Sequence, residues 1–273
     1  MTSPFAHDDG CPFEMFARHP RPELTGTVLR IVGYRERARR PGVQREPASL
    51  VVPLIVSFGE PFRIGLGRQP SPEDRYGSFA AGLFAGPVLI ESLGASHCLQ
   101  IDFTPLGARR FFGLPMREFT DRMVSLDAAL GNAGIRLREQ LGNLRCWKER
   151  FNLAERFVLD RIAGMAAPPR QLVEGYRWIE AAGGQIKVEK LAEHVGWSRK
   201  HLVNRFMSEV GVGPKTVARL ARFGRALATA QRSPSLAALA ADCGYSDQAH
   251  MTREFQALAG LPPTALISRA TAR

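Results

Sequence analysis

The sequence LAEHVGWSRKHLVNRF at residues 191–206 returns in modified form as LAADCGYSDQAHMTREF at residues 239–255. Each copy carries apolar residues at helical spacing on both sides of a central glycine, Gly196 in the first copy and Gly244 in the second. Glycine readily takes the positive φ that ends a helix. A serine two residues later, such as Ser198, can accept from the free N–H groups of the next helix. Each copy therefore predicts two helices joined by a tight turn.

The two copies agree at their apolar and small positions. Ala192 and Gly196 stand four residues apart, where two helices cross closely and only small side chains fit. The second copy repeats this arrangement with one extra residue in its second helix. The matching pairs are Leu191 and Leu239, Ala192 and Ala240, Gly196 and Gly244, Trp197 and Tyr245, Ser198 and Ser246, Leu202 and Met251, and Phe206 and Phe255.

In a helix-turn-helix, the second helix is exposed, so side chains near its start reach base edges in the major groove of DNA. Here these helices begin SRKHLVNRF at Ser198 and SDQAHMTREF at Ser246. An ordinary helical hairpin is the alternative for one such stretch, but two copies in a strongly basic region favour DNA recognition. The expected DNA-binding residues are Arg199, Lys200, Val203, Asn204, Gln248, Ala249, His250, Thr252 and Arg253.

The segment between the copies, GPKTVARLARFGRALATAQRSP, predicts one continuous helix. Pro214 suits a helix start, where its missing N–H costs nothing, and Ser233 and Pro234 open the next helix. About 18 residues at 1.5 Å each give roughly 27 Å. This is near the roughly 34 Å turn of B-DNA, so two recognition helices held apart by this helix can enter successive major grooves.

Charge and composition favour the same partner and disfavour others. The chain of 273 residues has a net charge of +11, and residues 170–273 hold 15 Lys and Arg against 8 Asp and Glu. A polyanion compensates such self-repulsion, so double-stranded DNA is the expected partner of the C-terminal part. The four scattered cysteines fit neither a disulfide framework nor a zinc finger. The longest apolar run is too short for a bilayer, so we expect a cytoplasmic protein without membrane contact.

The N-terminal part has a different pattern. From about 22 to 105, short apolar runs alternate with turn residues, which predicts strands of a barrel or sandwich. RERARRPGVQREP at residues 35–47 interrupts them as an expected exposed loop. His97 and Cys98 raise the alternatives of a metal ligand and an activated thiol. The spacing around them fits no metal site, and SHCLQIDF alternates like a strand with a buried Cys98. We therefore expect no metal, no cofactor and no catalytic residue.

A long helix is predicted over residues 136–163. Its apolar face includes Leu144, Trp147 and Phe151 and continues to a small, Pro-rich segment, GMAAPPR, that marks a domain boundary. This face can pack on its own barrel, on a second subunit or on the DNA-binding part. We expect it to carry the state of the N-terminal part to the DNA-binding part.

Residues 171–268 resemble the DNA-binding domain of the AraC/XylS family of bacterial transcription regulators. The family signature reads roughly A-x3-GY-S-x4-F-x-R-x-F-x4-G-x-x-P. Met251 replaces its usual Phe, and TALIS replaces the common Tyr-Arg after the final Pro. The N-terminal part resembles, more weakly, the β-barrel sensor domain of such regulators. The residues that match the signature are Ala240, Gly244, Tyr245, Ser246, Arg253, Phe255, Gly260 and Pro263.

The resemblance implies a two-domain fold class. The N-terminal domain, 1–164, is expected to be mainly β, a small cupin-like barrel plus helices, that senses a ligand or dimerises. A linker at 165–170 joins it to an all-α domain, 171–273, with two helix-turn-helix motifs.

The implied function is a sequence-specific transcription regulator, typically an activator. Its expected partners are double-stranded DNA, an unknown small-molecule effector, RNA polymerase and a second copy in a homodimer. In one alternative, the N-terminal domain only dimerises. In another, the chain is a DNA alkylation-repair enzyme, which needs a zinc-binding cysteine cluster that four isolated cysteines cannot supply.

Overall fold

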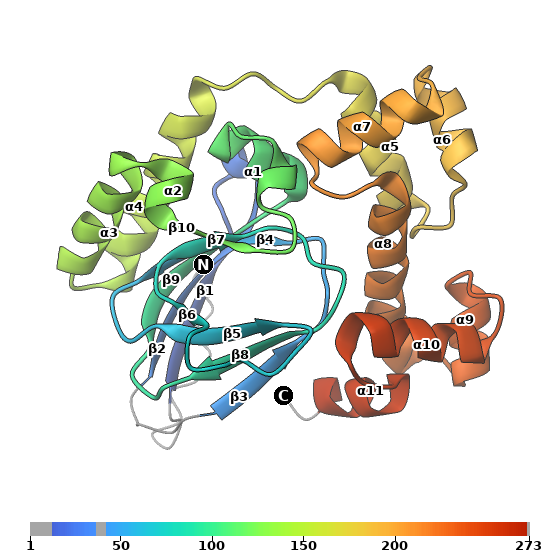
Figure 1. The fold of residues 1–273 in the computed structure, drawn as a ribbon, viewed down its shortest axis with the longest axis horizontal. Coiled ribbons are helices and arrows are strands. Elements are labelled where there is room, and N and C mark those ends of the chain that lie inside the picture. Colours follow the sequence, from blue (N-terminus) through green and yellow to red (C-terminus); the bar gives the residue numbers. More distant parts are fainter. Residues whose placement is uncertain (1–12, 37–41, 272–273) are drawn as a thin grey trace.

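The computed structural model describes residues 13–36 and 42–271 and shows a β-sheet half beside a helical half (Figure 1). The β-sheet half contains two sheets whose neighbouring strands are all antiparallel. The larger sheet has the order β1 (Phe13–Arg18), β2 (Val28–Glu36), β9 (His97–Phe103), β4 (Val52–Ser57), β7 (Phe79–Ala81) and β10 (Met123–Ser125). The smaller sheet has the order β3 (Gly42–Glu46), β8 (Val88–Ser92), β5 (Phe62–Leu66) and β6 (Arg75–Tyr76).

This half confirms the predicted β-sheet domain with helices, and it corrects one segment. The expected exposed loop at 35–47 contains the end of β2 and the whole of β3, while residues 37–41 lie outside the described residues. β3 is an edge strand whose first three residues are exposed. Charged side chains are common on such strands because they discourage pairing with another chain, so charge alone did not distinguish this strand from a loop.

Cys98 lies in the core that joins the two sheets, with Ile55, Ile64 and Phe79. Burial raises the pKa of its thiol to about 12, so the thiol stays protonated. This confirms the interpretation of Cys98 as a core residue. Within the described ranges, no group of three or more His, Cys, Asp and Glu is arranged to hold a metal ion, and no helix is long and apolar enough to cross a membrane.

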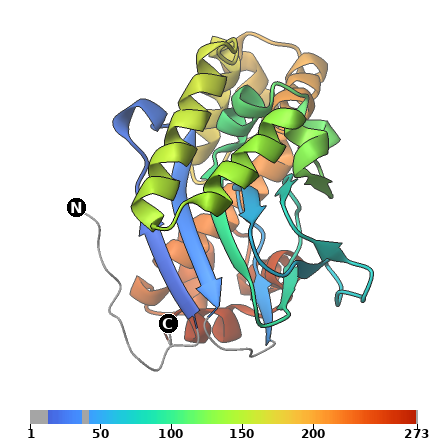
Figure 2. The ribbon, with the colours of Figure 1, turned by 90° about the vertical axis from the view of Figure 1, so that its left-hand side faces the viewer.

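Helices cover the larger sheet on one face (Figure 2). The predicted helix over 136–163 is wrong as a single element, because the chain turns at residues 144–146. Arg150 stabilises this break: its Nε donates to the carbonyl of Leu141 at 3.0 Å, and its Nη2 donates to that of Leu144 at 2.7 Å. The helical elements of this half are η1 (Pro22–Leu24), α1 (Pro105–Phe112), η2 (Met116–Glu118), α2 (Leu126–Leu130), α3 (Asn132–Asn143) and α4 (Trp147–Ala163).

The first turn of α4 packs on its own sheet. The indole of Trp147 lies against the Cα of Gly33 in β2, and its ring centroid is 5.8 Å from that of Phe16 and 5.5 Å from that of His97. Phe151 is buried below it. Of the three arrangements open to the apolar face, the structure shows packing on the larger sheet of the same chain.

Gly33→Ala should destabilise the N-terminal half by about 2 kcal/mol, because a Cβ at residue 33 would overlap the Trp147 ring and force a side chain or strand to move. Urea unfolding of the full chain measures this loss. Gly42→Ala is the matched control, since a Cβ there meets no atom within 4 Å and should change stability little. Equal stabilities for the two variants would contradict the packing.

The helical half is all-α, as predicted. The helix between the two motifs, α8, is continuous over 16 residues, or about 24 Å, and runs on into η3. The next helix is capped by Ser235, rather than opening at Ser233 and Pro234. The elements are α5 (Arg170–Ala181), α6 (Val188–Val195), α7 (Arg199–Glu209), α8 (Pro214–Thr229), η3 (Ala230–Arg232), α9 (Leu236–Asp242), α10 (Gln248–Ala259) and α11 (Pro263–Thr271).

The two helix-turn-helix motifs belong to different cores. The first, α6 and α7, shares one continuous core with the N-terminal half. This core includes Phe112 and Met116 from the N-terminal half and Phe206 and Val210 from the first motif. The second, α9 and α10, has a separate core, and the buried Ala48 from the N-terminal half packs into it. The β-sheet half therefore contacts both motifs.

Candidate nucleic-acid interface

The first helix-turn-helix has the predicted turn and cap. Gly196 ends α6 at φ +69°, and the N–H of Trp197 donates to the carbonyl of Ala192 at 3.0 Å. Ser198 caps α7 by accepting from the N–H of His201 at 3.2 Å. The start of α7, the first recognition helix, is therefore fixed by its own sequence.

The second motif repeats this turn with a shifted cap. Gly244 takes φ +75°, and the N–H of Tyr245 donates to the carbonyl of Ala240 at 2.9 Å. However, the cap of α10 is Asp247, not Ser246, since Asp247 accepts from the N–H of His250 at 2.6 Å. The same hydrogen bond holds the pKa of Asp247 below its usual value. The extra residue in the second copy lies at this cap and moves the start of α10 by one position.

The nine expected DNA-binding residues all lie among the first six residues of α7 or of α10. Eight of them are the first, second, fifth and sixth residues of their helix, so they occupy equivalent positions in α7 and α10. At helical spacing these four positions lie on one face of each helix. Most are exposed, while Val203 and Thr252 are half-buried in the middle of the face. The eight are Arg199, Lys200, Val203 and Asn204 on α7, and Gln248, Ala249, Thr252 and Arg253 on α10.

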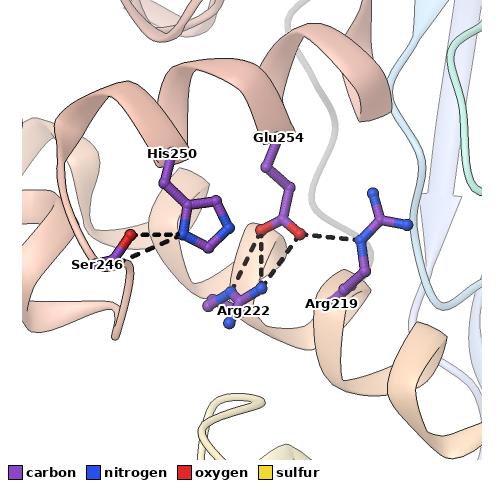
Figure 3. A network of polar contacts seen from close by, with 5 residues as sticks. All are labelled: Arg219, Arg222, Ser246, His250 and Glu254. Atoms are coloured by element: carbon purple, nitrogen blue, oxygen red, sulfur yellow. Dashed lines mark hydrogen bonds and ion pairs between the residues drawn. The ribbon is translucent and has the colours of Figure 1, made fainter.

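His250, the ninth, lies off this face. The hydroxyl of Ser246 is 3.1 Å from its Nδ1 (Figure 3). The His250 ring packs edge-on against Tyr245. His250 therefore contributes to the local structure at the start of α10. Arg199 forms an ion pair, since its Nη1 lies 3.1 Å from a carboxylate oxygen of Glu189. Both side chains are largely exposed, so this ion pair is weak.

A buried carboxylate joins α10 to the connecting helix α8, as Figure 3 shows. Glu254 accepts from the Nε of Arg219 at 2.9 Å and from the Nη2 of Arg222 at 3.1 Å. Burial raises the pKa of Glu254, but the hydrogen bonds and charges of the two arginines outweigh it and hold the pKa below its usual value. The guanidinium of Arg222 also lies 4.8 Å from the ring centre of Tyr245. These contacts fix the direction of the second recognition helix.

The far end of α7 is fixed by the N-terminal half instead. Glu209 lies 3.1 Å from the Nε of Arg109 in α1 and 3.5 Å from the Nη2 of Arg205. Thr120 donates from its hydroxyl to the carbonyl of Gly211 at 2.8 Å. Sequence reasoning identified none of these partners, because those from the N-terminal half lie about 90 to 100 residues away and belong to no local pattern.

Comparison with known families supports both halves of this description. Residues 191–269 match the family described as a helix-turn-helix domain, HTH_18. Residues 17–125 match a domain of unknown function, DUF6597. No curated protein matches the chain.

The chain also has similarity to several solved structures. ToxT from Vibrio cholerae is 8% identical, with 84% of this chain and 97% of that chain covered and a TM-score of 0.45. The AraC-like transcriptional activator CuxR is 16% identical, with 82% and 84% covered and a TM-score of 0.36. The C-terminal domain of AraT, a response regulator from Geobacillus stearothermophilus, is 16% identical, with 38% and 88% covered and a TM-score of 0.36.

The match over 191–269 spans both helix-turn-helix motifs and the helix between them, which are the elements that the sequence signature predicted. Residues 191–269 therefore form a helix-turn-helix domain of the kind that the resemblance to the AraC/XylS family predicts.

Proposed function

We propose that the chain is a transcription regulator of the AraC/XylS family that reads two adjacent DNA sites with α7 and α10. Its N-terminal domain, 1–164, controls the DNA-binding domain, 171–273, in response to a small molecule. The observation that carries this proposal is the contact of the N-terminal half with the carboxyl-terminal ends of both recognition helices. A regulator that binds DNA independently of its N-terminal domain has no need of these contacts.

The base-reading residues are proposed from chemistry and position. Asn204 and Gln248 carry amides that can bond adenine bidentately, and Arg199 and Arg253 carry guanidinium groups that can bond guanine. All four are exposed on the equivalent faces of the two helices. Each good bidentate pair is worth about 1–3 kcal/mol of discrimination against the wrong base. Lys200, Val203, Ala249 and Thr252 complete these faces.

The second recognition helix is contacted by β3, by the segment that follows it and by the residue before β8. The N–H of Ala48 donates to the carbonyl of Leu258 at 2.9 Å, and Arg45 and Pro87 lie beside Gly260, which ends α10. Together with Arg109 and Thr120 at the end of α7, these contacts link the position of both helices to the N-terminal half. A ligand that prefers one arrangement of the two halves shifts the population by its differential affinity.

A pocket at the end of the smaller sheet is the proposed effector site. Its volume is about 180 Å³. Apolar and charged side chains line it together: Ile64, Leu66, Tyr76, Met123, Arg122 and the ion pair of Arg68 with Asp74. Asp121, at φ +57°, also lines it and directly follows Thr120, which bonds the first helix-turn-helix. This continuity favours sensing over the alternative that the domain only dimerises. Homodimer formation and contact with RNA polymerase are further parts of the proposal.

Thr120→Val should weaken the response to an effector while leaving the preferred DNA sequence unchanged, because it removes the hydrogen bond to Gly211 without touching a recognition helix. A thermal-shift screen of metabolites on the full chain supplies the effector. The measured quantity is the ratio of the DNA affinities with and without that compound. This ratio should be about 2- to 10-fold smaller in the variant than in the wild type, because the variant loses about 1 kcal/mol of coupling.

Thr25→Val, at an exposed threonine of the N-terminal half, is the matched control and should keep the response. If Thr120→Val also keeps the full response, the coupling does not pass through Thr120. If no compound that stabilises the chain alters its DNA affinity, the N-terminal domain does not sense.

A further inference from the structure

A second basic site lies away from the recognition faces, between the connecting helix α8 and the first helix of the second motif, α9. It is a cleft of about 290 Å³. Its lining includes Arg225, Thr229, Arg232, Ser233, Asp242 and Cys243.

The arginines of α8 and η3 divide into two groups. Arg219 and Arg222 both form ion pairs with the buried Glu254. Arg225 and Arg232 line the cleft, and neither has an ion pair within 4.0 Å to any residue that the structure describes. Asp242 is the one carboxylate among the lining residues of the cleft. Two cations facing one carboxylate leave a net positive charge that favours an anion.

The cleft is located where the two helix-turn-helix motifs meet. Asp242 and Cys243 directly precede Gly244, the turn that leads to the second recognition helix. Gln185, from the loop before α6, donates to the carbonyl of Asp242 at 3.2 Å. In the same loop, Gly183 lies against the side chain of Arg225 and leaves no room there for a Cβ. Arg225 is thus held beside both motifs.

We propose that Arg225 and Arg232 bind a backbone phosphate of DNA between the two base-reading sites, so that the connecting helix is a third DNA contact. This inference rests on the proposed insertion of α7 and α10 into successive major grooves. On one face of the duplex, such grooves are separated by a minor groove bordered by two phosphate strands. The part of the protein between the recognition helices faces those strands. Guanidinium groups suit phosphate because they bind it with two parallel N–H donors.

The test is the salt dependence of DNA binding by the full chain. The logarithm of the binding constant falls with the logarithm of salt concentration by about 0.9 for each phosphate neutralised. The double variant Arg225→Gln/Arg232→Gln should reduce this slope by about 0.9, because the two arginines bind the same phosphate, and each single variant should reduce it by less. The preferred DNA sequence should not change, because phosphate contacts carry no direct sequence information.

Two further variants control for charge and folding. Arg136→Gln removes an exposed arginine from α3, far along the chain from the DNA-binding domain, and should leave the slope unchanged. Arg225→Lys keeps the charge and should retain most of the slope that Arg225→Gln loses. Thermal unfolding verifies that each variant is folded.

A folded double variant with the wild-type slope overturns the phosphate contact. Stabilisation of the wild type by inorganic phosphate without DNA, combined with an unchanged slope in the double variant, assigns the cleft to a free anion and also overturns it. Failure of the wild type itself to bind any DNA would instead contradict the proposed function.

Discussion

Glu254→Ala is expected to lower the free energy of unfolding of the helical half by about 3 kcal/mol at neutral pH. Removing one partner of a buried ion pair leaves the other charges uncompensated, and this usually costs about 3–5 kcal/mol. The lower end applies because Arg219 retains 34% and Arg222 17% of its side-chain exposure, so water partly solvates them. Urea unfolding followed by circular dichroism measures the loss.

The control for this variant is Glu193→Ala. Glu193 pairs with Lys190 on the surface of α6, and such an exposed pair contributes less than about 1 kcal/mol. A loss no larger for Glu254→Ala than for Glu193→Ala would show that the network does not stabilise α10 on α8. In addition, the pKa of Glu254 is lowered in the folded state, so its contribution is present above the ordinary value of 4.5 and is lost as the pH falls below it.

Trp147→Ala is the second substitution with a large expected effect. It should lower the free energy of unfolding of the N-terminal half by about 3 kcal/mol. Truncating a large aromatic residue that packs on a core costs about 3–5 kcal/mol, and the lower end applies because Trp147 is only half-buried. Self-association and the preferred DNA sequence should not change, because the indole packs on Gly33 and Phe16 of its own chain.

The double variant Gly33→Ala/Trp147→Ala sharpens this test. Residues in contact show non-additive effects, and the added methyl group at residue 33 meets no indole once Trp147 is gone. The double variant should therefore be more stable than the sum of the two single losses predicts. Additive losses in the double variant would contradict this packing. Dissociation of an oligomer by Trp147→Ala at unchanged stability would also contradict it, and would instead indicate that Trp147 is an intersubunit or coupling residue.

The local features of the DNA-binding half could be predicted because each depends on neighbouring residues. Gly196 and Gly244 are needed for positive φ, Ser198 caps the helix that follows it, and Pro214 starts α8. The sequence did not predict the cap at Asp247, because Ser246 and Asp247 are both good capping residues. Which of them caps α10 depends on whether the extra residue of the second copy lies before the helix or within it.

Features that depend on distant partners could not be predicted in this way. The apolar spacing of α3 and α4 continues across the break at residues 144–146, since both helices cover the same core. The break itself depends on Arg150 binding two carbonyls. In the contacts of Thr120 with Gly211 and of Ala48 with Leu258, the residues from the N-terminal half lie in loops whose sequences give no sign of a distant partner.

The equivalence of the two recognition faces gives the central claim its most direct test, which is binding-site selection with the full chain. The wild type should select two conserved half-sites about 10–10.5 base pairs apart. Asn204→Ala should relax the preference at one half-site, and Gln248→Ala should relax it at the other. Gln256→Ala, exposed in the second half of α10, should leave both unchanged. The same selected motif for the wild type and for both Asn204→Ala and Gln248→Ala would contradict base reading by these two helices.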